Sequence, residues 1–268
     1  STFISYQSVN QTNHQMKKVI LFAIAFTIST ISFSQNKNPF VNSIEKAVNL
    51  KKFQKQEAVS FDIELIFGGK TSLKGTVISA TNSSWVKLIK DNGTVVLFDG
   101  EKVWVTPALS GNSRERFDVF TWQYFFMSAF KLSDPGTVWQ NLGDLSYKEN
   151  MQLPAAKLTF KSGTGDASDD YYVVYQDDKN LIKAMGYIVT FGGKTVANAE
   201  RSAHAIVYDD YQNINGVTIA HQWYFHNWNI KNGLSNQIGD ATISNVKFLK
   251  ADDVPHQKPA DAVEVKLE

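Results

Sequence analysis

Apolar and polar residues alternate most regularly in the stretch VSFDIELIF, which runs from Val59 to Phe67. Every second position is apolar, and Ser60, Asp62 and Glu64 stand between them. Because successive side chains of a strand point to opposite faces, this period of two predicts a half-buried β-strand. One face of that strand should contribute to the core.

Further short alternating stretches are separated by turn sequences. Gly68-Gly69, Asp91-Asn92-Gly93 and Asp99-Gly100 are such turns, since Gly, Asn and Asp accept the positive φ of tight hairpins. Short connections favour antiparallel pairing, because parallel strands need long crossovers. The pattern predicts further strands at about 72–80, 84–90, 94–98, 102–106, 144–148, 155–161, 170–176, 181–191, 201–211, 217–227 and 238–248.

A helix is predicted between the N-terminal segment and the first strand. Ile44 and Val48 fall on one face at helical spacing, and Asn42 or Ser43 could serve as N-cap. The pattern indicates a short amphipathic helix over about 42–52.

A second helix, predicted over about 114–129, interrupts the strands. Phe117, Phe120 and Tyr124 recur at spacings of three and four, so the helix must lie against an apolar surface. The chain is thus predicted to be mainly β (α+β), with about eleven strands and two helices in one domain. A single antiparallel sheet of this size tends to curve, which predicts a large curved sheet or unclosed barrel.

The segment MKKVILFAIAFTISTISFSQ begins at Met16 and predicts an export signal. Lys17 and Lys18 precede a short apolar run, and small residues precede Gln35, as in a secretory signal peptide. A membrane anchor is the alternative, but the run is short for a span and diluted by hydroxyl residues. We expect an upstream segment or misplaced start (1–15), a cleaved signal (16–34), one domain (35–250) and a polar C-terminal tail (251–268).

Composition narrows the functional classes. The 268 residues are 43% hydrophobic and 13% aromatic, which is typical of a globular protein rich in strands. The 27 basic and 26 acidic residues nearly balance, and signal cleavage would remove two lysines, so no basic surplus supports nucleic-acid binding. The absence of Cys excludes disulfides, a thiol nucleophile, Cys-ligated zinc and lipid attachment at a lipobox Cys. A periplasmic protein without a lipid anchor is expected.

The repeated motif FGGKT resembles the end of a phosphate-binding loop but lacks its beginning. That loop needs a Gly five residues before the second Gly, where Glu64 and Ile188 stand in the two copies. Both copies are also predicted to connect strand to strand, whereas the phosphate loop leads into a helix. No nucleotide site is therefore predicted.

Acidic pairs and histidines offer weak candidates for catalysis. Neighbouring carboxylates on a strand point to opposite faces, so no pair can form a two-carboxylate site alone. His204, His221 and His226 lack visible acidic metal ligands, and no cofactor or metal is predicted. An envelope hydrolase using dispersed residues such as Asp170, Asp210 and His221 remains the enzymatic alternative.

The aromatic residues allow two interpretations of the interior. A curved sheet too large for two helices to fill would leave a lipophilic cavity, whereas many aromatics could instead fill the core. The second interpretation describes a structural envelope protein. The pattern does not choose between them.

The sequence resembles the periplasmic lipoprotein-carrier superfamily (LolA/LolB-like), and most closely its secreted relatives with FKLSDPG after the aromatic helix. The similarity rests on FDGEKVW (Phe98–Trp104), where Asp-Gly forms a turn, and on the paired stretches around DDYYVVYQDDKN and YDDYQNINGVTIAHQWYF. Ala220 replaces the Pro that the family usually has in the second stretch.

This resemblance implies an unclosed antiparallel barrel whose concave face is covered by helices and shelters a lipid or a lipoprotein acyl chain. It supplies no catalytic residues, and the missing lipobox Cys favours a soluble carrier. A non-enzymatic, monomeric binder with a possible envelope protein partner is therefore predicted. The residues predicted to line its cavity are Phe61, Ile63, Leu65, Trp85, Trp104, Phe120, Tyr124 and Phe125.

Overall fold

The computed structural model describes residues 38–107, 113–162, 169–190, 194–254 and 256–266. The predicted signal peptide and upstream segment lie outside these residues. The described residues belong to one compact unit. Among them, no helix combines the length and apolarity needed to cross a bilayer.

The helix predicted over 42–52 is present as two short helices, α1 (Pro39–Ala47) and α2 (Leu50–Phe53). Asn49 separates them because its φ of 58° is left-handed and cannot continue a right-handed helix.

The start of α1 differs from the prediction. The N-cap is Asn38, whose side chain accepts a hydrogen bond from Phe40 N at 3.0 Å. Pro39 follows at the first helical position, where its fixed φ suits the helix and its missing N–H costs nothing. The prediction of Asn42 or Ser43 as N-cap is therefore wrong.

The first half of the sheet follows the alternating pattern closely. Its five strands form a meander in which each strand pairs antiparallel with the next. They are β1 (Ala58–Phe67), β2 (Lys70–Ala80), β3 (Val86–Lys90), β4 (Val95–Phe98) and β5 (Val103–Thr106).

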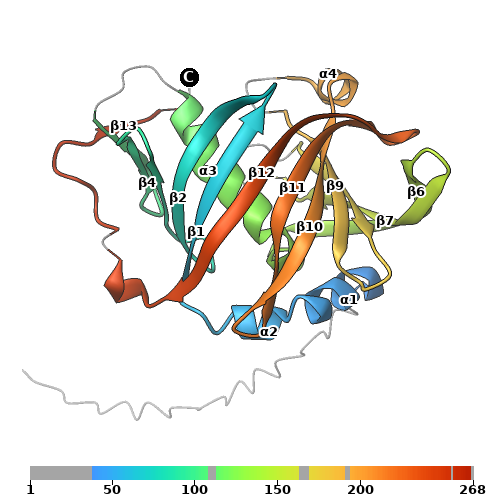
Figure 1. The fold of residues 1–268 in the computed structure, drawn as a ribbon, viewed down its shortest axis with the longest axis horizontal. Helices are drawn as coiled ribbons and strands as arrows, with labels where there is room; N and C mark the ends of the chain where they lie inside the picture. The colour runs from blue at the N-terminus through green and yellow to red at the C-terminus, as the bar shows by residue number, and fades with distance from the viewer. Residues whose placement is uncertain (1–37, 108–112, 163–168, 191–193, 255, 267–268) are drawn as a thin grey trace, which may run out of the picture. The chain divides into compact units, whose positions relative to one another are not determined.

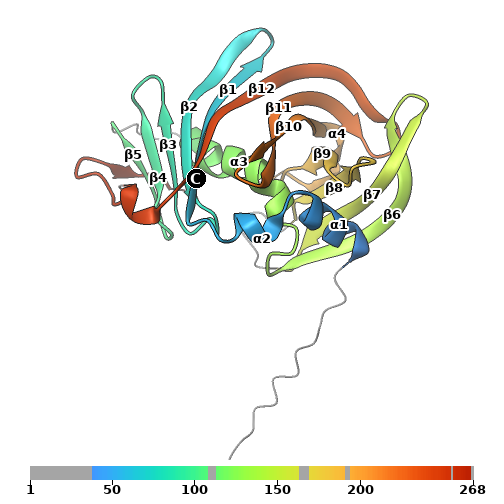
Figure 2. The same cartoon turned by 60° about the horizontal axis from the view of Figure 1, so that its bottom comes forward.

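The aromatic helix is present as α3 (Ser113–Met127) and continues as the 3-10 turn η1 (Ser128–Phe130). Figure 2 shows α3 running through the hollow of the curved sheet, with α1 and α2 along its open side. Helices therefore occupy the concave face.

The second half contains seven strands, and also one helix that the pattern did not predict. The strands are β6 (Thr137–Lys148), β7 (Met151–Phe160), β8 (Tyr171–Gln176), β9 (Ile182–Ile188), β10 (His204–Ile214), β11 (Val217–Asn229) and β12 (Gly233–Leu249). The additional helix is α4 (Val196–Arg201).

Phe191–Gly193 of the second FGGKT copy lie outside the described residues, but its last residue directly precedes α4, so the predicted strand-to-strand connection is wrong. Thr195 is the N-cap, and its hydroxyl accepts a hydrogen bond from Asn198 N at 3.3 Å. The first copy does form a hairpin, in which Gly68 and Gly69 have φ values of 56° and 74°.

The chain's last described strand, β13 (Val263–Glu264), follows the 3-10 turn η2 (Ala251–Asp253) and pairs with β5. The thirteen strands of the described residues form one antiparallel sheet in the order β13-β5-β4-β3-β2-β1-β12-β11-β10-β9-β8-β7-β6. β1 and β12 join the two halves (Figure 1). The predicted fold class is confirmed, with thirteen strands in place of about eleven.

Both faces of the sheet carry apolar clusters. The largest, here the concave cluster, contains Phe61, Ile63 and Leu65 together with side chains of α2 and α3. A second cluster lies on the other face of β8, where Tyr171, Val173 and Tyr175 alternate with the concave-facing Tyr172 and Val174. β8 is consequently buried on both faces.

Candidate functional site

The floor of the concave face is built by the alternating strand that the sequence makes most obvious. Phe61, Ile63 and Leu65 of β1 are at most 1% exposed and belong to the concave cluster. Their polar neighbours Asp62 and Glu64 are only partly buried, in keeping with the predicted two-residue period.

Helix α3 covers this floor with aromatic rings. Phe126 stacks on Phe61 with ring centroids 3.8 Å apart and planes within 11°. Phe120 meets Phe98 of β4 edge-on at 4.9 Å. Contacts of this kind add about 0.5–1.5 kcal/mol each to the burial of apolar area. These two contacts hold α3 against β1 and β4.

Six of the eight residues predicted to line a cavity come together here. Phe61, Ile63, Leu65 and Phe125 are buried in the concave cluster. The side chains of Phe120 and Tyr124 are partly buried and pack against it. The structure therefore gathers these six on one face.

Trp85 lies elsewhere, in a small cluster with Ala58, Ala80 and Val254. Its ring stacks on His256 at a centroid distance of 4.6 Å. Ala58 has the opposite parity to Phe61 on β1, so this cluster belongs to the other face of the sheet.

Trp104 also points away from the concave cluster. Val103 and Val105 of β5 belong to that cluster, so the side chain between them faces outward. The Trp104 indole donates a hydrogen bond to Asp99 Oδ2 at 2.6 Å, and Lys258 Nζ lies 4.1 Å from its ring centroid. The alternation within VWVT (Val103–Thr106) already indicates that Trp104 faces the side of the strand opposite to its two valine neighbours.

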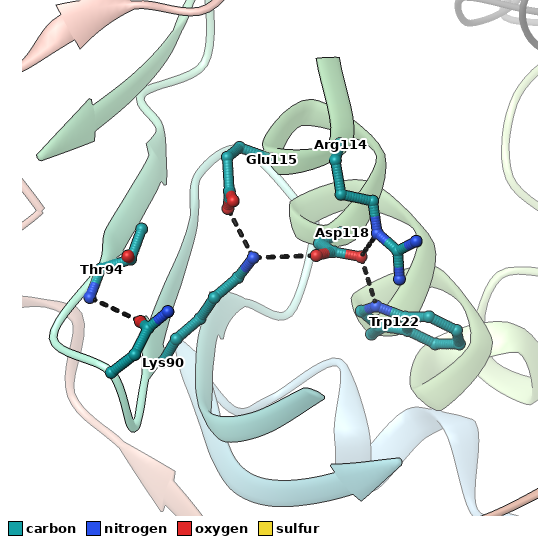
Figure 3. A network of polar contacts seen from close by, with 7 residues as sticks. Lys90, Thr94, Arg114, Glu115, Asp118 and Trp122 are labelled. Carbon is teal, nitrogen blue, oxygen red and sulfur yellow. Dashed lines mark hydrogen bonds and ion pairs between the residues drawn. The ribbon is translucent and has the colours of Figure 1, made fainter. Parts of the chain in front are cut away.

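A buried polar network fixes the N-terminal part of α3 to the sheet (Figure 3). Lys90 Nζ at the end of β3 lies 2.6 Å from Glu115 Oε2 and 2.9 Å from Asp118 Oδ2. Asp118 Oδ1 accepts hydrogen bonds from Arg114 Nε at 2.9 Å and Trp122 Nε1 at 3.1 Å. These five residues are called the Lys90 network.

Three charged members of the Lys90 network are well shielded from solvent. The side chains of Lys90, Glu115 and Asp118 are 13%, 6% and 3% exposed. Buried charges require partners, because solvent no longer compensates them. The network therefore fixes where α3 lies, and sequence reasoning did not identify any of its ion pairs.

A small chamber lies under the other end of α3. Its volume is about 20 Å³, and Ser128, Tyr208, Tyr211 and Trp223 are among its lining residues. A space of this size holds about one water molecule and cannot hold an acyl chain. In this conformation, aromatic side chains fill the concave face.

The chamber combines apolar walls with a few polar atoms. Tyr208 OH donates to Phe125 O at 3.0 Å, and Tyr211 OH donates to Ile182 O at 2.7 Å. Burial raises the pKa of Tyr208 and of Tyr211 above the usual range for tyrosine, so both phenols stay neutral at physiological pH.

A larger pocket, of about 210 Å³, lies on the opposite face of β1 and β2. Its lining includes Asp62, Glu64 and Lys74, and Glu64 and Lys74 form an exposed ion pair at 3.2 Å. Polar, solvated walls of this kind do not suit a lipophilic ligand.

The residues named for the hydrolase alternative occupy two places. Asp170 precedes β8, where its carboxylate accepts hydrogen bonds from Thr190 N and Oγ1 at 2.7 and 2.8 Å. His221 lies on β11, and burial lowers its pKa while nearby Asp210 opposes that effect. β9 and β10 separate β8 from β11, so the structure does not join Asp170 to this pair. The described residues contain no group of three His, Asp or Glu side chains placed to hold a metal.

Comparison with solved structures identifies the fold. A LolA superfamily protein from Nitrosomonas europaea superposes with a TM-score of 0.51 at 13% identity, covering 81% of this chain and 97% of its own. An outer membrane lipoprotein-sorting protein domain from Vibrio parahaemolyticus gives 0.47 at 14% identity, covering 80% and 96%. A DUF1329 family protein from Desulfovibrio piger gives 0.46 at 14% identity, covering 79% and 93%.

No protein-family model and no curated protein matches the chain. At 13% identity, the structure from Nitrosomonas europaea supports a statement about the fold of this chain and not about its function. The chain has a LolA-like fold, and the resemblance inferred from its sequence is confirmed at that level.

Proposed function

We propose that this protein is a non-enzymatic envelope protein that binds a lipid, an acyl chain or a lipoprotein between the sheet and α3. The observation that supports this most directly is the aromatic face of α3 lying on the apolar concave face of a LolA-like sheet. The ligand would replace α3 side chains such as Phe126 as the partner of Phe61. The six gathered aromatic and aliphatic residues are the proposed contacts.

Binding an acyl chain at this site is favourable only if the free energy gained by burying the chain exceeds the cost of moving α3. Burying a methylene group gains about 0.8 kcal/mol, so roughly ten buried carbons would correspond to micromolar affinity before other costs. Because α3 fills the site, the free energy of moving it must be subtracted. The apparent affinity is the intrinsic affinity multiplied by the fraction of molecules in which α3 has moved away from the sheet.

The cellular setting follows from the sequence. The predicted signal over 16–34 would deliver a chain without Cys to the periplasm, where it could act as a soluble, monomeric carrier. A carrier of this type would exchange its ligand with an envelope protein partner.

Native mass spectrometry of the gently purified protein tests the proposal. Palmitate and a palmitoyl lysophospholipid would be the added probes, and we expect a one-to-one adduct with at least one of them. Glu115→Gln should increase the adduct, because it removes the 2.6 Å ion pair that holds α3 closed. Lys74→Met removes an exposed ion pair on the other face and is the matched control. A bare polypeptide mass for all three proteins would refute the proposal.

The filled concave face also supports a second candidate, a structural envelope protein. The small volume of the chamber under α3 is the observation that favours it. Hydrogen exchange separates the two candidates. A carrier should exchange the amides of α3 well before those of β1, whereas a permanently filled core should protect both equally.

A further inference from the structure

Trp223 carries a buried hydrogen-bond donor without an acceptor. Its side chain on β11 is 1% exposed, and Nε1 has no hydrogen-bond partner among the described residues. An indole N–H can only donate, and buried donors are almost always satisfied in folded proteins. The exception therefore requires an explanation at this position.

Three hydroxyl groups that line the chamber with Trp223, those of Ser128, Tyr208 and Tyr211, already have acceptors for their own hydrogens. Ser128 Oγ and Tyr208 OH both lie within donating distance of Phe125 O, at 3.1 and 3.0 Å. Tyr211 OH donates to Ile182 O. Of these four lining residues, Trp223 retains the donor that a bound group could satisfy.

The chamber is also electrically neutral. Its lining residues include no Lys, Arg, His, Asp or Glu. A carboxylate buried here would lose its hydration without gaining a cation, which is strongly unfavourable. A neutral carbonyl oxygen could accept from the indole at much lower cost.

The chamber is adjacent to the proposed acyl site. Phe126 lines it and also stacks on Phe61 of the concave cluster. Once α3 moves and Phe126 leaves Phe61, a ligand with its carbonyl beside Trp223 could extend its chain towards Phe61.

We propose that Trp223 Nε1–H binds the carbonyl oxygen of an ester- or amide-linked acyl chain. The protein would then select acylated molecules over free fatty acids and over plain hydrocarbons. This inference rests on the proposed function and specifies the chemical class of its ligand.

Paired probes isolate the hydrogen bond. Methyl decanoate and dodecane have similar chain length, but only the ester offers a carbonyl. Their affinities for the full chain can be measured by displacement of the fluorescent probe N-phenyl-1-naphthylamine. We expect the ester to bind about five- to tenfold more tightly than dodecane, as one neutral hydrogen bond predicts. Free decanoate at pH 8 should bind more weakly than the ester.

Two matched variants test the assignment to Trp223. Trp223→Phe should abolish the preference for the ester, and the ratio of the two affinities corrects for any general loss of packing. Trp228→Phe is the control, because its indole already donates to Tyr175 OH at 3.1 Å in the second cluster. That variant should keep the preference.

Indole ¹⁵N NMR of the unmodified protein gives a direct measurement. Methyl decanoate should move the Trp223 Nε1–H resonance downfield, and dodecane should not. Equal affinities for ester and dodecane, or equal shifts with both, would overturn the carbonyl assignment while leaving acyl binding intact. If neither probe binds, the proposed function and this inference both fail.

Discussion

Replacing Lys90 with Met should destabilise the protein far more than the loss of an ordinary surface charge. The variant keeps an unbranched apolar stem but removes the ammonium that contacts Glu115 at 2.6 Å and Asp118 at 2.9 Å. Arg114 and Trp122 still reach Asp118, so Glu115 loses more. Removing one partner of a buried ion pair typically costs about 3–5 kcal/mol, because a charge stays buried without compensation.

Urea unfolding monitored by circular dichroism measures this loss as a change in midpoint at constant m-value. Lys74→Met is the control: its pair with Glu64 is 53% and 39% exposed, and its loss should cost less than about 1 kcal/mol. Adding Glu115→Gln and Asp118→Asn to Lys90→Met should recover part of the stability. A loss of less than about 1 kcal/mol for Lys90→Met would refute the view that this network holds α3 in place.

Two further predictions concern stability. Gly233→Ala should lower the free energy of unfolding by about 2–4 kcal/mol in thermal or urea unfolding, because φ is +75° and a Cβ would collide with the Tyr147 carbonyl. Gly69→Ala is the control: its φ is +74° but the space around it is open, so it should cost only about 1 kcal/mol. Equal costs would contradict this role of the Tyr147 contact. Burial lowers the pKa of His204 and of His221, so the unfolded state takes up protons first as the pH falls below about 6.5. The free energy of unfolding should therefore decrease from pH 7 to pH 5, by at most about 1.4 kcal/mol per pH unit for each histidine, and a slope unchanged in the His204→Asn/His221→Asn variant would contradict this assignment.

Regular alternation made the first half of the sheet predictable. β1 was recognised from a two-residue period, and the same period indicated which of its residues face the core. The hairpin turns at Gly68-Gly69 and Asp99-Gly100 then fixed the order of the strands up to β5. Local chemistry sufficed here because consecutive strands pair with each other.

The sheet edges were less predictable, because their pattern is weak. β6 begins at Thr137, earlier than predicted, since its first residues are largely exposed and Gly143 interrupts the pairing with a φ of +72°. β13 has only two residues and exists because the edge of β5 offers unpaired backbone groups. α4 was missed because its six residues are too few to show a helical period.

By itself the sequence determined a single curved antiparallel sheet, an aromatic helix and the apolar face of β1, because these follow from periodicity and turn chemistry. Only the tertiary structure decided which aromatic residues share the hollow, placing Phe125 inside and Trp104 outside. It also decided that Lys90 meets Glu115 and Asp118, and that Trp223 keeps an unsatisfied donor. These features depend on how the sheet curves around α3, and contacts between residues distant in the chain leave no local pattern from which to infer them.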